Sequence, residues 1–225
     1  MDIYGDNNHI NFEEKAKLVI HLIPFNSFDT SQMLDITELE EQKDNIKCFN
    51  DPQFGCIGSY SLNGILKYER FNLNNIISYT ELYRSGMIET VDIHNIQRPH
   101  EQYYYIFGTL IEKKILKHIE NQLIVLQNLD IQPPIAISIS LLDLKGAVII
   151  PSNTGRNPES ESQFKEGFKQ ENIHLPDVVL EEYSYDIGSL LKLPFDSLWN
   201  ASGHPYSPNC VSGTWEEVGH FGQTY

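Results

Sequence analysis

The chain has 225 residues, of which 40% are hydrophobic and 21% are charged. This composition fits one ordinary globular domain and excludes a disordered chain. Thirty-one Asp and Glu residues against sixteen Lys and Arg residues give a formal net charge of -15. The average field therefore repels nucleic acid and anionic membranes, so we expect this chain to bind neither directly. The argument concerns the average field only, and a local basic patch would escape it.

The N-terminus has no basic segment before an apolar run, and no apolar stretch approaches the roughly 18 to 20 residues that span a bilayer. We therefore expect a cytoplasmic protein without a signal peptide. The cysteines Cys48, Cys56 and Cys210 form no CxxC pair. Reduced thiols are the expectation, and a Cys48–Cys56 bridge requires the chain between them to fold back.

The first part of the chain combines a polar start with one clear strand. Residues 1–15 predict a linker or a frayed segment. The run AKLVIHLIP at 16–24 is β-branched and apolar and ends in proline, which predicts a buried strand. An acidic helix should begin near Asp35 or Thr37, where a capping oxygen precedes a glutamate. Residues 44–58 predict a loop.

Three strands should follow this loop. The run SYSLNGILKYERF at 59–71 is broadly alternating, with Asn63-Gly64 as a turn or a bulge within it. The runs 77–84 and 87–93 flank Ser85-Gly86, which predicts a hairpin with a two-residue turn.

This hairpin carries the first pair of candidate binding residues. A two-residue turn places Arg84 opposite Met87 and Leu82 opposite Glu89, so that Arg84 and Glu89 become diagonal neighbours on one face. An arginine beside a turn can present its guanidinium to an anion. A surface cross-strand ion pair is the alternative interpretation.

The second half begins with the longest predicted helix, at 99–128. Apolar residues repeat on one side at a spacing of 3.6, and Lys113, Lys117 and Glu120 fall on the other side. Next, the strands at 135–142 and 147–150 are predicted to pair as a hairpin. A flexible polar loop should follow at 152–175. A short strand at 178–183 and a closing helix at 190–201 complete the predicted elements.

These elements predict an α+β fold. We expect a single, mainly antiparallel sheet of about five to six strands packed on one long helix, with a coil-rich C-terminal tail. By analogy at the fold level, this build is GAF-, PAS- or roadblock-like. The predicted organisation is a linker at 1–15, an α+β core at 16–151, a loop at 152–175, and a C-terminal strand, helix and tail at 176–225 packed on the core.

The sequence contains no standard catalytic, nucleotide-binding or metal-binding motif, so we assign no catalytic residue, metal or cofactor. His21 and His118 lie among apolar residues. Each is predicted to be a core histidine bonded to backbone or to a carboxylate, with a general base as the alternative. Trp199 is predicted to pack on a sheet edge. With Asn200 and His204 it forms a second candidate binding set.

Several segments together resemble a known family: LVIHLIPFNSF at 18–28, YTELYRSGMIE at 79–89, PPIAISISLLDLKG at 133–146, and PFDSLWNASGHPYSPN at 194–209 with GTW at 213–215. They are similar to the C-terminal region of bacterial proteins whose N-terminal half is a Schlafen AlbA-type domain. The resemblance runs from about Ala16 to Trp215. It implies an AlbA-type partner domain in cis or in trans. The DNA- and ATP-binding functions associated with the family belong to that domain, which this chain lacks, so no residue here inherits them.

Three functions follow as hypotheses. The first is a non-catalytic sensor or interaction domain that regulates or oligomerises an AlbA-type effector in bacterial defence or regulation, by binding that domain or by self-association. The second is a small-ligand-binding module of GAF or PAS type, with its site between the sheet and the 152–175 loop. The third is a hydrolase or nuclease, which requires carboxylates or a histidine and a nucleophile that converge in a pocket.

Overall fold

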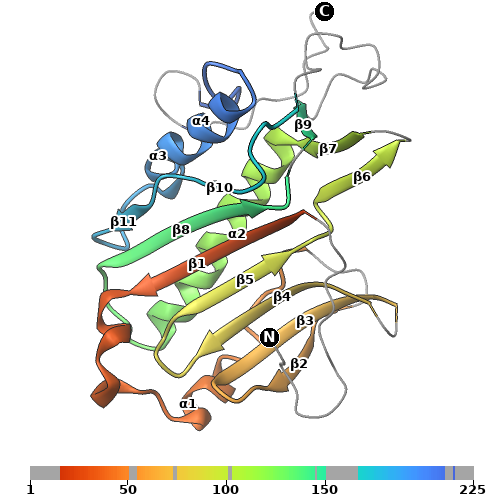
Figure 1. Ribbon diagram of the computed structural model, residues 1–225. Helices are drawn as coiled ribbons and strands as arrows, with labels where there is room; N and C mark the ends of the chain where they lie inside the picture. Colours follow the sequence, from red (N-terminus) through yellow and green to blue (C-terminus); the bar gives the residue numbers. More distant parts are fainter. Residues whose placement is uncertain are drawn as a thin grey trace, which may run out of the picture.

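The computed structural model describes residues 16–50, 55–72, 75–100, 103–144, 146–150, 167–210 and 215. The predicted α+β class is confirmed. Strands form a large, antiparallel sheet and a smaller second sheet, and one long helix packs along the large sheet (Figure 1). The predicted linker at 1–15 and much of the predicted 152–175 loop lie outside the described residues.

The large sheet has eight strands in the described part of the chain. Its order is β10-β8-β1-β5-β4-β3-β2, and β11 also pairs with β8. The strands are β1 (Lys17–Pro24), β2 (Ile57–Tyr60), β3 (Gly64–Asn72), β4 (Asn75–Tyr83), β5 (Ile88–Asp92), β8 (Ile135–Leu142), β10 (Ile173–His174) and β11 (Val178–Leu180). The sheet exceeds the five to six strands expected, because two very short strands add to the β8 edge and a turn at Leu62-Asn63 separates β2 from β3. The turn lies one residue before the predicted Asn63-Gly64, since Gly64 is the first residue of β3.

The second sheet was not expected. It contains β6 (Ile96–His100), β7 (Tyr103–Phe107) and β9 (Ala147–Ile150), in the order β6-β7-β9. The predicted pairing of β9 with β8 in a hairpin is wrong, because β9 instead runs parallel to β7. Local alternation defines β8, and β9 is a short apolar run, but the partner of each strand is set by distant parts of the chain.

The long helix, α2 (Gly108–Asn128), starts nine residues later than predicted. The segment YYYIF before it is rich in aromatic residues that favour strands, and it forms β7. Gly108 packs directly against the ring of Trp199, since a Cβ at this position would lie 2.4 Å from Trp199 Cζ2. The helix therefore begins where only glycine leaves room for the indole.

The shorter helices agree better with the sequence. The predicted acidic helix is confirmed as α1 (Ile36–Glu41), in which Asp35 caps the N-terminus and Glu38 completes a capping box. Two short 3₁₀ helices precede it, η1 (Phe25–Phe28) and η2 (Thr30–Gln32). The closing helix is divided into α3 (Ile187–Leu190) and α4 (Lys192–Ala201).

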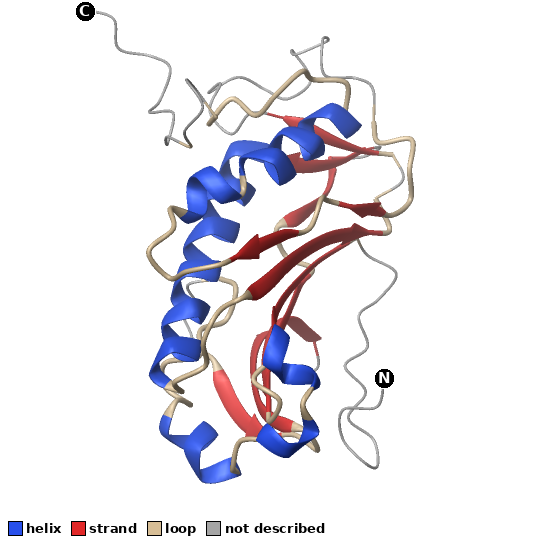
Figure 2. Ribbon diagram, turned by 90° about the vertical axis from the view of Figure 1, so that its left-hand side faces the viewer, coloured by secondary structure: helices blue, strands red, loops and turns tan. Residues whose placement is uncertain are grey.

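The main core lies between α2 and the large sheet, and Figure 2 shows the long helix running along one side of the strands. Ile111, Ile115 and Ile119 of α2 belong to one apolar cluster with Ile137 of β8. Phe195, Leu198 and Trp199 of α4 join the same cluster. The C-terminal helices therefore share the core of the sheet. None of the described helices has the length and apolar composition needed to cross a membrane.

Candidate functional site

The side of the large sheet that faces α2 is polar over β3, β4 and β5. Lys67, Thr80 and Thr90 are aligned across these strands, and Thr90 contacts α2. One row further along, Ser78 pairs in register with Glu69 and with Asp92. Apart from the half-buried Glu69, these side chains are buried. Buried polar groups are costly unless they are hydrogen-bonded, so partners from the helix and a loop are needed here.

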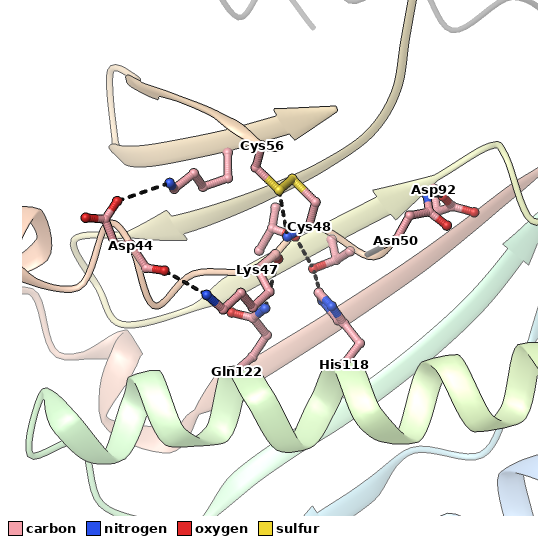
Figure 3. Close-up of a disulfide and its surroundings, with 11 residues drawn as sticks. Asp44, Lys47, Cys48, Asn50, Cys56, Asp92, His118 and Gln122 are labelled. Carbon is pink, nitrogen blue, oxygen red and sulfur yellow. Dashed lines mark hydrogen bonds and ion pairs between the residues drawn. A yellow bond between two sulfur atoms is a disulfide. The ribbon is translucent and has the colours of Figure 1, made fainter. Parts of the chain in front are cut away.

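Two α2 side chains meet this polar region. His118 Nε2 lies 2.8 Å from Thr90 Oγ1, and Gln122 Nε2 donates to the carbonyl of Lys47 at 3.0 Å (Figure 3). Burial lowers the pKa of His118 from 6.5 to about 3, which leaves the imidazole neutral near pH 7. His118 is a core histidine with a backbone hydrogen bond to Cys48, as predicted, and it also bonds the Thr90 hydroxyl.

A disulfide joins Cys48 to Cys56, with the two Cα atoms 6.2 Å apart. The expectation of reduced thiols is wrong for this pair, because the chain folds back and brings the cysteines together. The backbone N–H of Cys48 donates to Cys56 Sγ at 3.2 Å. The bridge links the Lys47–Asn50 segment to the start of β2 (Figure 3). Cys210 is free and buried.

A polar network anchors the other end of this segment. Asp92, which is fully buried, accepts hydrogen bonds from Asn50 Nδ2 at 3.0 Å and from the backbone N–H of Asn95 at 2.9 Å. Lys114 Nζ donates to Asn50 Oδ1 at 3.2 Å and also to Asn95 Oδ1. Burial raises the pKa of Asp92 and lowers the pKa of Lys114. The network thus places one α2 lysine beside the loop.

A pocket of about 500 Å³ opens between α2 and the Lys47–Asn50 segment. Four lysines line it, together with both bridged cysteines, two apolar side chains, two asparagines and neutral His118: Lys47, Lys113, Lys114, Lys117, Cys48, Cys56, Phe49, Leu110, Asn50, Asn121 and His118. None of these lining residues is acidic, in a chain with thirty-one Asp and Glu residues. We call this site the lysine pocket.

A second hollow of about 250 Å³ shares Leu110 and Lys114 with the lysine pocket. Phe107, His94 and Asn95 also line it. The two hollows therefore follow the same edge of α2, and Lys114 lies where they meet.

The described lining of the lysine pocket is suited to binding an anion. Four ammonium groups attract an anion and can donate hydrogen bonds to its oxygens. The described lining residues include no carboxylate, and the low pKa of His118 makes it a poor proton acceptor near pH 7. Within the described residues, no three His, Cys, Asp or Glu side chains are grouped to hold a metal ion.

The structure separates the first predicted pair, Arg84 and Glu89. The connection between Tyr83 and Met87 has three residues where the prediction had two, so Leu82 pairs with Ile88 and Glu89 lies opposite Glu81. The predicted two-residue register is therefore wrong. Arg84 Nε instead donates to the carbonyl of Leu34 at 3.0 Å, which ties the turn to the segment before α1.

Glu89 belongs to a polar cluster on the face of the sheet away from α2. It lies 2.9 Å from His21 Nε2 and accepts from the Tyr79 hydroxyl at 2.7 Å. Burial raises the pKa of Glu89, but these hydrogen bonds outweigh burial and hold it below its ordinary value. Burial raises the pKa of the opposite Glu81. Of the alternatives predicted for His21, the carboxylate partner is confirmed, but the core location is wrong, because His21 is half-buried on the face of the sheet away from α2.

The second predicted set is brought together at the end of α4. The Trp199 and His204 rings lie edge to face, with centroids 5.3 Å apart, and Asn200 Nδ2 donates to the carbonyls of His204 and Pro205 at 2.8 and 2.9 Å. Trp199 is almost fully buried. These contacts stabilise the chain reversal after the helix, far from the β4–β5 connection at the α1 end of the sheet (Figure 1).

Sequence reasoning missed Glu112, which fixes this C-terminal region to α2. Glu112 is fully buried and accepts hydrogen bonds from Trp199 Nε1 at 2.6 Å, Ser207 Oγ at 2.8 Å and Asn209 Nδ2 at 2.6 Å. Burial raises the pKa of Glu112, and these donors oppose the rise. The one signal in the sequence is a glutamate directly after Ile111 on the apolar side of a helix. The partners lie nearly a hundred residues away and could not be identified.

The lysine pocket was also missed. Lys113 and Lys117 were assigned to the polar side of the long helix, which is correct but common to most surface helices. Only the fold brings Lys47 across from them. Searches against protein-family models, curated proteins and solved structures gave no match, so the Schlafen AlbA-type resemblance stays a prediction.

Proposed function

We propose that this chain is a non-catalytic sensor domain that binds a small anionic ligand in the lysine pocket. The observation that carries the proposal is the gathering of four lysines in a pocket whose described lining includes no acidic residue, in a strongly acidic protein. The proposal joins two of the sequence-based hypotheses, the regulatory domain and the small-ligand module. It places the ligand between α2 and the Lys47–Asn50 segment instead of beside the 152–175 loop.

The local charges outweigh the unfavourable overall charge. A hydrogen bond to a charged group contributes about 1.5–3 kcal/mol. Asp92 and Glu69 act on Lys114 but do not belong to the described lining, and salt screens more distant exposed charges beyond about 8–10 Å at physiological ionic strength. An anion inside the pocket is therefore attracted by its neighbours more strongly than it is repelled by the rest of the molecule.

The volume and lining define the ligand class. A cavity of about 500 Å³ lies within the range that holds a small molecule. Lysines recognise phosphate or carboxylate groups, and Asn50 and Asn121 offer neutral hydrogen-bonding groups beside them. We infer a ligand with one or more phosphate or carboxylate groups. We do not favour a hydrolase or nuclease, because the lining supplies no acid–base pair.

The resemblance supports the regulatory half of the proposal. A cytoplasmic domain that senses an anion would transmit binding to an AlbA-type domain in cis or in trans, or to a second copy of itself. Arg84, Glu89, Trp199, Asn200 and His204 do not line the lysine pocket. The lysine pocket therefore gives no support to the prediction that these five residues bind a ligand. A role for any of them in partner binding stays a prediction.

Calorimetric titration with inorganic phosphate and pyrophosphate tests the proposal. We expect the chain to bind at least one of them, and Lys117→Gln to weaken binding about five- to tenfold, or about 1–1.4 kcal/mol. Lys192→Gln is the matched control. It changes the net charge equally, but Lys192 pairs with Asp196 on α4. Equal affinity of the two variants, or no binding of either anion at millimolar concentration, would contradict the proposal.

A further inference from the structure

We propose that the Cys48–Cys56 disulfide is a redox switch for the lysine pocket. The oxidised chain holds the pocket in its binding form, and reduction to two thiols weakens anion binding. The inference rests on the proposed function for its ligand, and it adds the regulation of the same site. Disulfides inside cells are usually transient and redox-sensing, which agrees with the expected cytoplasmic location.

The position of the bridge supports this inference. Both cysteines line the lysine pocket, so the disulfide is part of its wall. On one side, the segment that carries Cys48 is anchored independently: Gln122 binds the Lys47 carbonyl, Asn50 binds Asp92, and the Phe49 ring packs 5.3 Å from the His118 ring. This half of the wall therefore remains in place without the bridge.

The Cys56 side is held more weakly. Cys56 directly precedes β2, a strand of four residues at the edge of the sheet that pairs only with β3 among the described strands. Ile57 and Tyr60 of β2 are exposed. Tyr60 contacts Glu40 and Lys43, which belong to α1 and the turn after it and not to the pocket wall. Among the described contacts, the disulfide and the Cys48 N–H to Cys56 Sγ hydrogen bond therefore join Cys56 to that wall. Reduction of the disulfide releases this side of the wall toward solvent.

The reaction itself is an ordinary thiol–disulfide exchange. The thiolate of a cellular dithiol attacks Sγ of Cys56, the more exposed of the two residues, since Cys48 is 4% exposed and Cys56 is half-buried. The Cys48 sulfur leaves as a thiolate and takes up a proton. The second thiol of the dithiol then releases Cys56, so two electrons and two protons pass to the cysteines and the dithiol becomes a disulfide.

The lysines favour both directions of this exchange. Lys47, Lys113 and Lys117 line the same pocket as the two sulfurs, and nearby positive charge stabilises a thiolate as a leaving group and as a nucleophile. The same charges bind the anion. By linkage, an anion that prefers the oxidised form must also shift the thiol–disulfide equilibrium toward the disulfide by the same factor.

The test uses the full chain with Cys210→Ala, so that only the Cys48–Cys56 pair reacts. The protein is oxidised with glutathione disulfide or reduced with dithiothreitol, free thiols are counted, and pyrophosphate affinity is measured by calorimetry. We expect affinity at least fivefold weaker in the reduced state. Cys48→Ser/Cys56→Ser should match the reduced protein. Far-UV circular dichroism checks that the oxidised protein, the reduced protein and the double variant have the same fold. If the double variant does not fold, the comparison of the oxidised and reduced protein with both cysteines present still tests the switch.

The outcomes separate the two proposals. Equal pyrophosphate affinity in both redox states overturns the switch and leaves the proposed function standing. If Cys48 and Cys56 do not form a disulfide with glutathione disulfide, the switch is also overturned. Pyrophosphate binding to the thiol form would in that case still support anion binding in the lysine pocket. Absence of phosphate and pyrophosphate binding in both states overturns the proposed function and the switch with it. As a second readout, pyrophosphate should protect the disulfide in a dithiothreitol titration of the unmutated pair but not in Lys117→Gln.

Discussion

At the scale of single residues, His118 couples the stability of the fold to pH. It is 3% exposed, and burial lowers its pKa from 6.5 to about 3. Because this pKa is lower in the folded chain than in the unfolded chain, the folded state binds fewer protons between these values. The stabilising contribution is therefore complete above pH 6.5 and is lost as the pH falls toward 3.

We predict that His118→Gln removes this pH dependence. When the pH is lowered from 7.5 to 5, the unfolding free energy of the natural chain should fall by about 2 kcal/mol more than that of the variant, because of His118. Urea unfolding at both pH values measures this difference. The buried carboxylates titrate in both proteins, so their contribution to the pH dependence cancels in the comparison. His174→Gln is the control, because His174 is exposed on β10. Identical losses in His118→Gln and the natural chain would contradict the prediction.

At the scale of elements, the connection Arg84–Met87 sets the register of β4 and β5. The backbone N–H of Tyr83 donates to the carbonyl of Met87 at 2.9 Å, and Gly86 adopts a left-handed φ of 81°. Such connections close with glycine in the left-handed position. The register differs by one residue from that of the predicted turn, which places Glu89 beside Glu81 and lets Arg84 bind Leu34.

We predict that Gly86→Ala destabilises the chain by about 2–3 kcal/mol. Part of this loss is the left-handed backbone, at about 1 kcal/mol, and part is overpacking, since a Cβ would lie 2.6 Å from Ile131 Cδ1. Gly203→Ala is the matched control, because Gly203 has a φ of 88° and a Cβ added there would meet no atom within 4 Å. Thermal or urea unfolding compares the two. Equal losses would show that Ile131 moves aside without cost.

At the scale of the whole molecule, one apolar core joins the sheet, α2 and the C-terminal helices. The same cluster contains Leu18 near the start of β1 and Trp199 at the end of α4. Glu112 of α2 also accepts hydrogen bonds from Trp199 of α4 and from Ser207 and Asn209 in the segment after α4. Since these elements bury the same surface, the C-terminal region cannot leave without exposing the core of the sheet, and unfolding should be cooperative.

We predict that the two tryptophans and the sheet report the same unfolding transition. Trp199 and Trp215 are the only tryptophans in the chain, and both belong to the C-terminal region. Tryptophan fluorescence and far-UV circular dichroism should therefore give coincident urea curves. Trp215→Phe leaves Trp199 as the single reporter and controls for local changes at Trp215. A fluorescence transition that precedes the loss of circular dichroism would mean that the C-terminal region unfolds separately.

Features that depend on neighbouring residues could be predicted from the amino-acid sequence. Strict alternation predicted β8, a β-branched apolar run predicted β1, and the Asp35–Glu38 pattern predicted the start of α1, because strand period and helix capping act over a few residues. The α+β class followed from these elements.

Only the tertiary structure decided which distant groups meet. It paired β9 with β7, joined Cys48 to Cys56, gave Glu112 its partners and brought Lys47 to the lysines of α2. Each of these depends on contacts between segments far apart in the chain, and their free energy arises from burial and charge in the folded state. The periodicity of any one segment carries no record of them.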